Sequence, residues 1–150
     1  MNTGFVPTET LAIAAPVTPF PRMLERHGLT LPRTPLEILQ VNLTARCNLA
    51  CTHCHVESGP KREEALDARG IDRLIALMST APALHTLDIT GGAPELHPQF
   101  RRLAAAGRAH GLKVINRCNL SVLFEPGQED TAEFLAAQGI AVVASLPCYS

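Results

Sequence analysis

Short apolar runs alternate along this chain with longer segments in which apolar residues recur at helical spacing. The runs predict strands at Glu37–Thr44, Leu84–Thr90, Lys113–Asn119 and Ile140–Leu146. The segments between them predict one helix over Asp67–Ser79, a second from Pro98 to near Gly111, and a third from Asp130 to Gly139. Strands that alternate with helices predict an α/β fold in which a parallel sheet is joined by right-handed crossovers.

Local signals mark where these elements begin and end. Asp67 is the expected N-cap of the first helix, and Pro82 follows its end. Asp130 and Glu133 have the spacing of a capping box. The run Ile140–Leu146 shows no polar alternation, which predicts a strand that is covered on both faces.

The first 35 residues differ in composition from the rest, because they hold six prolines. They predict an extended lead-in over residues 1–35, with one helical turn near Met23–His27, ahead of a core domain over residues 36–150. The apolar stretch Leu11–Ala15 is short, has no basic region before it and is broken by Pro16. We therefore expect neither a signal peptide nor a membrane span.

Composition narrows the class of protein further. The chain has 150 residues, 46% of them hydrophobic, and a net charge of −1. It is long enough for one domain with a sizeable core, and without a basic stripe no nucleic-acid partner is expected.

Its five cysteines are an odd number, and three of them lie close together. That pattern favours a metal site in a reducing, cytoplasmic setting over a disulfide framework.

The three clustered cysteines, Cys47, Cys51 and Cys54, follow the first expected strand with the spacing Cys-x3-Cys-x2-Cys. An iron–sulfur cube has four irons, and each one wants a thiolate. Three thiolates leave one iron without a protein ligand, and an open metal position is where a substrate or cofactor binds. The loop therefore predicts a [4Fe–4S] cluster that takes part in chemistry.

Two other metal sites compete with this interpretation. Structural zinc usually takes two separated pairs of ligands, and no second pair lies near this loop. Cys51, Cys54 and His55 also match the Cys-x-x-Cys-His motif that attaches haem, although that motif leaves Cys47 unused. A zinc-binding or haem-binding module without catalytic activity therefore remains an alternative.

Parallel strands would bring further loops to the same rim of the sheet as the cysteine loop. Gly91 and Gly92 follow the second strand. The pair indicates either a tight turn or a place where a small ligand approaches the backbone. Cys118 and Cys148 end the third and fourth strands. Each is either a small buried residue or a soft ligand for a thiophilic substrate.

The cysteine loop resembles the cluster-binding loop of the radical S-adenosylmethionine (SAM) enzymes, and Thr90–Glu95 is similar to the segment that holds the methionine end of SAM there. The resemblance implies a partial TIM barrel, a [4Fe–4S] cluster and SAM. Ala93 stands where the family usually has Glu, so Glu95 becomes the candidate carboxylate for the cofactor's ammonium group. The implied cofactor-binding residues are His53, Gly91, Gly92, Ala93, Pro94, Glu95 and Ser145.

A narrower resemblance joins five segments to the arsenosugar-biosynthesis radical SAM proteins: Gln40–Thr44, Cys54–Glu57, Asp88–Leu96, Arg117–Leu120 and Ala144–Tyr149. It implies transfer of the adenosyl group to a methylated trivalent arsenic species, with Cys118 and Cys148 as candidate substrate ligands. It also implies a reductase or a protein of the flavodoxin or ferredoxin type as electron donor. A radical SAM enzyme that acts on another substrate, such as a peptide or a cofactor precursor, is the alternative.

The radical SAM core resembles a six-stranded partial barrel, which at ~30 residues per βα unit needs roughly 200 residues or more. Only four strands are expected here. The sequence thus suggests a chain truncated after its fourth strand, and we expect it to be inactive or unstable on its own.

Overall fold

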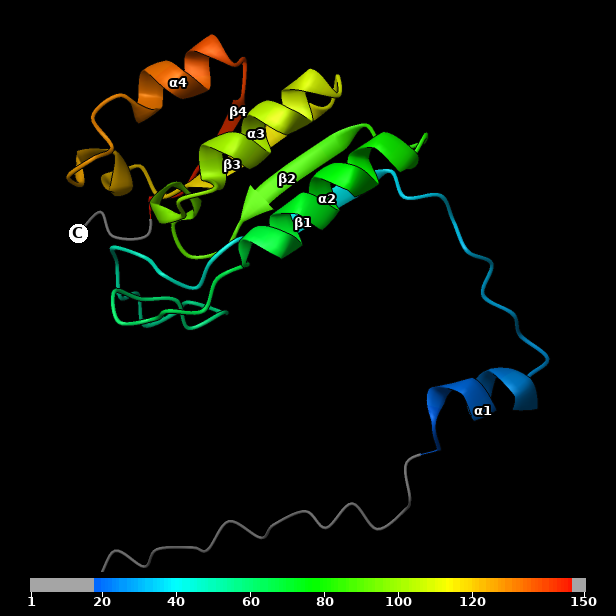
Figure 1. Ribbon diagram of the computed structural model, residues 1–150. Helices are drawn as coiled ribbons and strands as arrows, with labels where there is room; N and C mark the ends of the chain where they lie inside the picture. Colours follow the sequence, from blue (N-terminus) through cyan, green and yellow to red (C-terminus); the bar gives the residue numbers. More distant parts are fainter. Residues whose placement is uncertain (1–17, 147–150) are drawn as a thin grey trace, which may run out of the picture. The chain divides into compact units, whose positions relative to one another are not determined.

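A computed structural model describes residues 18–146 of the chain (Figure 1). The chain divides between Thr34 and Pro35 into two units, and each is described by itself. In the first unit, α1 covers Phe20–Arg26 with Pro19 at its N-cap. This helix is longer than the expected turn at Met23–His27 and starts earlier, because the fixed φ of Pro21 suits the first turn of a helix.

The second unit alternates strands and helices in the predicted order. Its elements are β1 (Ile38–Asn42), α2 (Ala68–Thr80), β2 (Thr86–Thr90), η1 (Pro94–Leu96), α3 (Phe100–Ala109), β3 (Lys113–Cys118), η2 (Ser121–Phe124), α4 (Thr131–Ala137) and β4 (Ala141–Ala144), where η marks a 3₁₀ turn. The four strands form one parallel sheet in the order β1-β2-β3-β4. The predicted α/β fold with a parallel sheet is confirmed.

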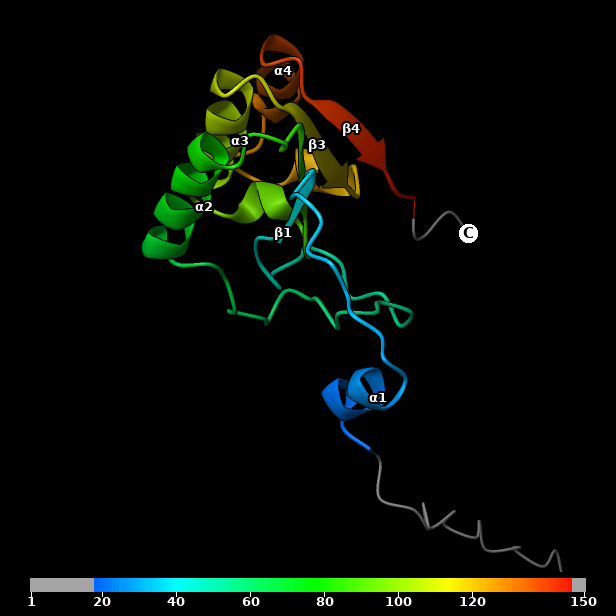
Figure 2. The ribbon, with the colours of Figure 1, turned by 90° about the vertical axis from the view of Figure 1, so that its right-hand side faces the viewer.

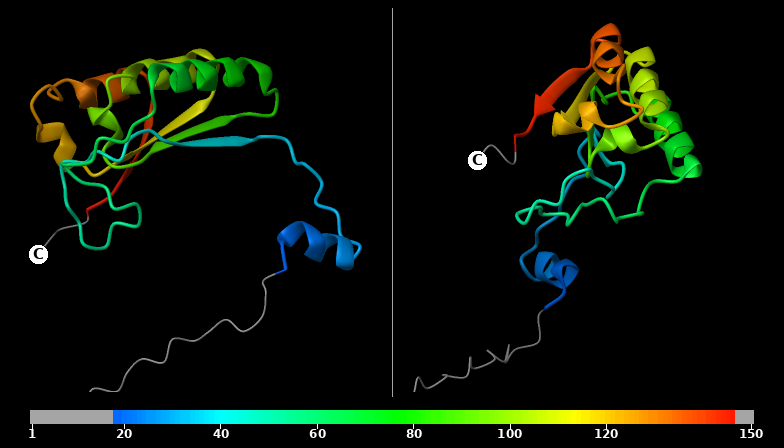
Figure 3. Two further views of the ribbon diagram at one scale, coloured as in Figure 1. Left: turned by 60° about the horizontal axis from the view of Figure 1, so that its bottom comes forward. Right: turned by 90° about the vertical axis from the view of Figure 1, so that its left-hand side faces the viewer.

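The helices α2, α3 and α4 lie along one face of this sheet (Figures 1 and 3). On that face Leu87 and Ile89 of β2 and Val114 of β3 are buried in the main hydrophobic core, together with Phe100 and Leu103 of α3. Burial of these apolar side chains, at roughly 25 cal/mol per Å² removed from water, is what holds the helices to the sheet.

The other face of the sheet carries polar side chains. The polar Gln40 of β1 and Asp88 of β2 are in register there, and none of the three helices covers that face (Figure 2). Arg117 donates from Nε and Nη2 to the two carboxylate oxygens of Asp88, at 2.9 and 2.8 Å. Gln40 Nε2 donates to the same carboxylate at 3.1 Å, so Asp88 is held by two neighbours on this face.

We expect this ion pair to make stability depend on pH. The Arg117 guanidinium holds the pKa of the Asp88 carboxyl below its ordinary value of 3.8, so the stabilisation is present above that pH and is lost as pH falls through the lowered value. Arg117→Met should cost about 1–2 kcal/mol at neutral pH, a figure reduced because the guanidinium is half exposed. Urea unfolding should show that the difference from wild type shrinks as the pH falls below 3.8.

The exposed pair of Arg102 and Asp72 on α3 and α2 supplies the control for that experiment. Ion pairs in solvent contribute little, so Arg102→Met should change the free energy of unfolding by no more than about 0.5 kcal/mol at either pH. A difference between Arg117→Met and wild type that stays constant with pH would contradict the role given to Asp88.

The structure confirms one of the three sequence predictions about helix starts and corrects the other two. Asp67 caps α2, since its carboxylate accepts from Gly70 N–H at 2.7 Å, as predicted. The capping box at Asp130 is wrong: Asp130 makes no side-chain cap on α4, because its carboxylate pairs with Arg101 of α3 instead. The second helix begins at Phe100 and not at Pro98, since Gln99 is its N-cap.

The prediction that the fourth strand is covered on both faces is wrong. All four residues of β4 are exposed, and Val142 and Val143 keep 44% and 46% of their surface accessible. β4 pairs with β3 on one side and lies at the edge of the sheet (Figure 2). An apolar run therefore signals a strand without telling which neighbours cover it.

Within residues 18–146, no helix has the length and apolar character that crossing a membrane requires.

Candidate active site

The cysteine loop leaves β1 through a short stem of paired backbone. Ala45 N–H donates to Glu64 O at 2.8 Å, Gly59 N–H donates to Ala45 O at 3.1 Å, and Cys47 N–H donates to Gly59 O at 3.1 Å. These bonds hold the outgoing and returning limbs together up to Cys47. Cys47 is consequently fixed by the stem, whereas Cys51 and Cys54 lie on the loop beyond it.

All three predicted metal ligands face one cavity of about 300 Å³. Cys47, Cys51 and Cys54 line it, and none of them is in a disulfide. The other residues that line it are Leu49, His53, His55, Val56, Ser58, Gly91, Gly92, Asn119 and Ser145. Residues that follow each of the four strands thus meet at one end of the sheet.

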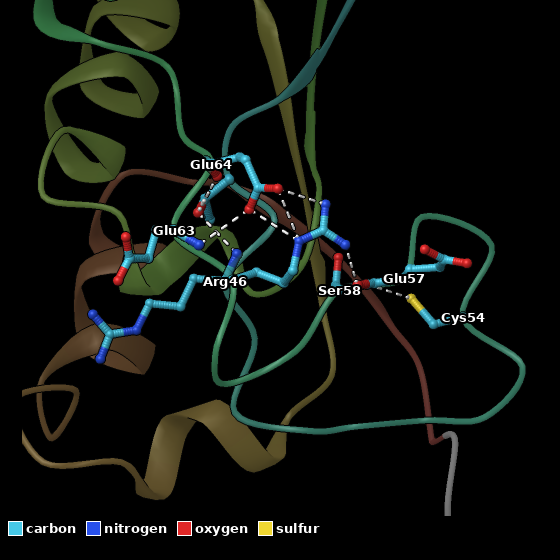
Figure 4. A network of polar contacts seen from close by, with 8 residues as sticks. Arg46, Cys54, Glu57, Ser58, Glu63 and Glu64 are labelled. Atoms are coloured by element: carbon cyan, nitrogen blue, oxygen red, sulfur yellow. Dashed lines mark hydrogen bonds and ion pairs between the residues drawn. The ribbon is translucent and has the colours of Figure 1, made fainter.

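The surroundings of Cys54 favour its thiolate, the form that binds metal. Ser58 N–H donates to Cys54 Sγ at 3.4 Å, and Figure 4 shows Ser58 and Glu57 beside that sulfur. Backbone N–H groups, first of Ser58 and then of Val56, hold the pKa of the Cys54 thiol below its ordinary value of 9.0. Leu49 N–H donates in the same way to Cys47 Sγ at 3.4 Å.

Contacts of the Arg62 side chain hold the returning limb of the cysteine loop in place. Arg62 Nη1 donates to Glu57 O at 2.7 Å, and Arg62 Nη2 pairs with Glu64 at 2.9 Å. Glu64 belongs to the stem through its backbone oxygen, which accepts from Ala45 N–H, and Figure 4 shows its carboxylate in the polar network. Arg62 thereby ties the segment that carries Cys54 to the stem that carries Cys47.

Gly91 and Gly92 also line the cavity, but their backbone neighbours explain why they are glycines. Gly92 N–H donates to Thr44 O at 2.7 Å, and Ala93 N–H donates to Arg46 O at 2.8 Å. A Cβ at Gly92 would lie 2.3 Å from Arg46 O. The sequence left a tight turn and the approach of a small ligand as explanations for the glycine pair, and the structure shows that the stem of the cysteine loop also approaches it closely. Contact of this pair with SAM stays a prediction.

The rest of that segment turns into the interior. Ala93 and Glu95 keep only 1% and 4% of their surface accessible, and Pro94 is buried as well. Asn116 Nδ2 donates to Glu95 Oε1 at 2.6 Å. None of these residues is among those that line the cavity, so their contacts with SAM stay predictions.

Cys118 is likewise buried, with 1% of its surface exposed, and Leu120 N–H donates to its sulfur at 3.3 Å. Burial, followed by the neighbouring Glu95, raises the pKa of the Cys118 thiol to about 12. A neutral thiol that does not line the cavity is a poor ligand for a soft metal or metalloid, so its predicted substrate role is not supported by its surroundings. Cys148 lies outside the described residues.

Sequence reasoning assigned no role to a polar group that the structure places against Cys47. Asn119 Nδ2 donates to Asn48 Oδ1 at 2.8 Å and to Cys47 Sγ at 3.5 Å. Asn48 Nδ2 in turn donates to Ser121 Oγ at 2.9 Å. The available signal was the position of Asn119, directly after a strand end and on the same rim as the cysteine loop.

The cavity fits a cluster of the predicted kind by the chemistry of its donors. The thiols of Cys47, Cys51 and Cys54 line it, none of them in a disulfide. Those of Cys47 and Cys54 accept backbone N–H groups, and the glycine turn lines the same cavity. Among the described residues, no three Cys, His, Asp or Glu side chains are grouped so that they could hold one metal ion. The fit of the cavity to a cluster therefore rests on the three thiols that surround it.

Comparison with known proteins shows which family the chain resembles. A family model described as the Radical SAM superfamily matches residues 41–146. The chain is 38% identical over 106 residues to a GTP 3',8-cyclase of Synechococcus sp. (strain CC9902), an alignment that covers 69% of this chain and 29% of that protein. It is 33% identical over 99 residues to the mycofactocin maturase MftC of Mycobacterium ulcerans (strain Agy99), covering 65% of this chain and 26% of that protein.

Two crystal structures share the fold. BtrN in complex with AdoMet and 2-DOIA superposes with a TM-score of 0.62 at 16% identity, over 79% of this chain and 49% of BtrN. Streptococcus suis SuiB bound to S-adenosylmethionine gives a TM-score of 0.54 at 19% identity, over 82% of this chain and 27% of SuiB. The fold is that of the partial barrel in these radical SAM enzymes, and the chain spans only part of each relative. On the match over residues 41–146, the chain belongs to the radical SAM superfamily.

Proposed function

We propose that this chain binds a [4Fe–4S] cluster through Cys47, Cys51 and Cys54 and uses it to cleave SAM reductively. The observation that carries the proposal is the shared cavity, in which the three thiols meet the glycine turn after β2. When bound, the cluster supplies the electron that splits the sulfonium of SAM into methionine and a 5′-deoxyadenosyl radical. The electron would come from a reductase or from a protein of the flavodoxin or ferredoxin type.

The residues of this chain have distinct tasks in that reaction. The stem fixes Cys47, a backbone N–H donates to its sulfur, and the backbone N–H groups at Cys54 favour the thiolate form of that residue. His53 and Ser145 line the same cavity and are the side chains that we assign to contact with SAM. The residues that line the cavity would orient the cofactor. A cluster of this kind, held by cysteines that form no disulfide, suits a reducing and therefore cytoplasmic setting.

The substrate proposal keeps two candidates. The five segments that resemble arsenosugar-biosynthesis proteins favour a methylated trivalent arsenic species, to which the adenosyl group would be joined. The relatives named above are not arsenosugar proteins, and the identity of 38% to a GTP 3',8-cyclase favours a cofactor precursor such as GTP as the second candidate. We also propose that further strands beyond β4 complete the barrel, since the four residues of β4 are exposed.

The test is anaerobic reconstitution with iron and sulfide, followed by reduction with dithionite in the presence of SAM. We expect about four irons per chain, and formation of 5′-deoxyadenosine by a chain extended with the further strands proposed above, because the four-stranded chain alone is expected to be inactive or unstable. In the extended chain, adding dimethylarsinite should yield an adenosylated arsenical, and adding GTP in a separate reaction tests the second candidate. Stoichiometric zinc with no iron uptake, or an extended chain that binds iron but forms no 5′-deoxyadenosine, would contradict the proposal.

A further inference from the structure

Asn119 is held at both ends of its side-chain amide. Its Oδ1 accepts from Val122 N–H at 2.9 Å and from Ser121 Oγ at 3.2 Å. Its Nδ2 donates to Asn48 Oδ1 at 2.8 Å and to Cys47 Sγ at 3.5 Å. The rotamer is therefore fixed from the β3–η2 side, and a polar N–H is aimed at one of the proposed iron ligands.

We propose that Asn119 is a positioning residue that fixes Cys47 and raises the reduction potential of the cluster bound there. This inference rests on the proposed function, because it concerns the same cluster. Nothing in the resemblance to known families assigns Asn119 this task. It follows from the contact between the amide and the sulfur.

The direction of the effect follows from charge. Reduction adds an electron to the cluster and spreads negative charge onto the cysteine sulfurs, and an N–H that points at a sulfur stabilises that charge. Only 8% of the surface of Cys47 is accessible, so water screens this interaction little. Losing the N–H should disfavour the reduced state and shift the midpoint potential to more negative values.

The alternative is that Asn119 only holds the cysteine loop to the end of β3 through Asn48. Both roles predict a loss of stability when Asn119 is changed, but only the first predicts a change in potential while the cluster is intact. The donors from Leu49 and Ser58 belong to the backbone and persist in any substitution. Asn119 is a donor to Cys47 that mutagenesis can remove.

Two substitutions at Asn119 and one control separate these roles. Asn119→Leu removes the donor and adds no charge. Asn119→Asp keeps an oxygen to accept from Val122 N–H and Ser121 but replaces the donor with a negative group. Ser121→Ala breaks the contacts of Ser121 with Asn48 and Asn119 while the bond from Asn119 to Cys47 stays.

The wild-type chain and each variant are reconstituted anaerobically, the iron and sulfide of each are counted, and a redox titration is followed by the electron paramagnetic resonance signal of the reduced cluster. We expect normal iron content throughout, a more negative midpoint potential in Asn119→Leu, a larger shift in Asn119→Asp, and the wild-type potential in Ser121→Ala. Thermal unfolding of the three variants measures the structural role separately.

The outcomes divide cleanly. Wild-type potentials in both Asn119 variants, or an equal shift in Ser121→Ala, would overturn the inference while leaving the proposed function intact. Loss of the cluster from both Asn119 variants, with the fold kept, would also overturn it, since the residue would then be needed for assembly and not for tuning. A wild-type chain that takes up no iron contradicts the proposed function, and this inference with it.

Discussion

Replacing any one of Cys47, Cys51 and Cys54 with alanine should abolish the [4Fe–4S] cluster, with iron and sulfide falling from about four per chain to near zero. With one thiolate gone, two of the four irons would lack a protein ligand, and two thiolates are too few to hold a cube in competition with water and free thiols. The measurement is iron and sulfide content with the visible absorption spectrum after anaerobic reconstitution. Circular dichroism shows whether the fold survives.

Cys118→Ala is the matched control, because Cys118 lies near the same end of the sheet but is buried and does not line the cavity. Its thiol stays protonated at neutral pH, since burial raises its pKa to about 12. We expect wild-type iron content in this variant and a loss of stability of about 1 kcal/mol or more from the deleted buried group. Full iron content in any of the three loop variants would contradict the ligand assignment, as would loss of iron from a folded Cys118→Ala chain.

The sequence predicted the order of strands and helices well, because the residues that begin and end each element lie within or next to it. Asp67 begins α2 through its own side chain, and Gly139 ends α4 with a φ of +60° that glycine adopts without strain. Asp130 was misread because its carboxylate found a partner 29 residues away in Arg101. Which neighbour a polar side chain meets depends on packing between elements, and no local pattern contains that information.

At the candidate site, too, the sequence predicted what lies within one segment and missed contacts between distant segments. The three cysteines were identified from spacing alone, since one loop carries them all, and the structure shows them around one cavity. Glu95 and Cys118 were expected at the cavity as well, but η1 turns the carboxylate inward and β3 points the thiol into the core. Asn119 went unassigned because its contact with Cys47 joins residues 72 positions apart. Side-chain direction at a strand end is fixed by the fold and not by sequence distance.

Gly92→Ala should disrupt the cysteine loop itself and not only the binding of SAM. The added Cβ would lie 2.3 Å from Arg46 O, and that oxygen is the acceptor for Ala93 N–H, so the stem has to move away from the turn. Since Cys47 follows Arg46 directly, its sulfur moves with the stem. We expect iron content after reconstitution to fall several-fold, with SAM affinity falling as well, and the larger Gly92→Val to lose both.

Gly59→Ala is the control for that substitution, because Gly59 belongs to the same stem and no atom lies within 4 Å of a Cβ built on it. Its backbone bonds with Ala45 and Cys47 survive the change, so iron content and SAM affinity should stay at wild-type values. Iron and sulfide analysis, together with equilibrium binding of SAM to the anaerobic protein, distinguishes the two explanations of the glycine pair. Normal iron with weakened SAM binding in Gly92→Ala would show that the cofactor, and not the stem, requires glycine there. Normal values of both would mean that the stem tolerates the displacement, and the close approach would then have no functional consequence.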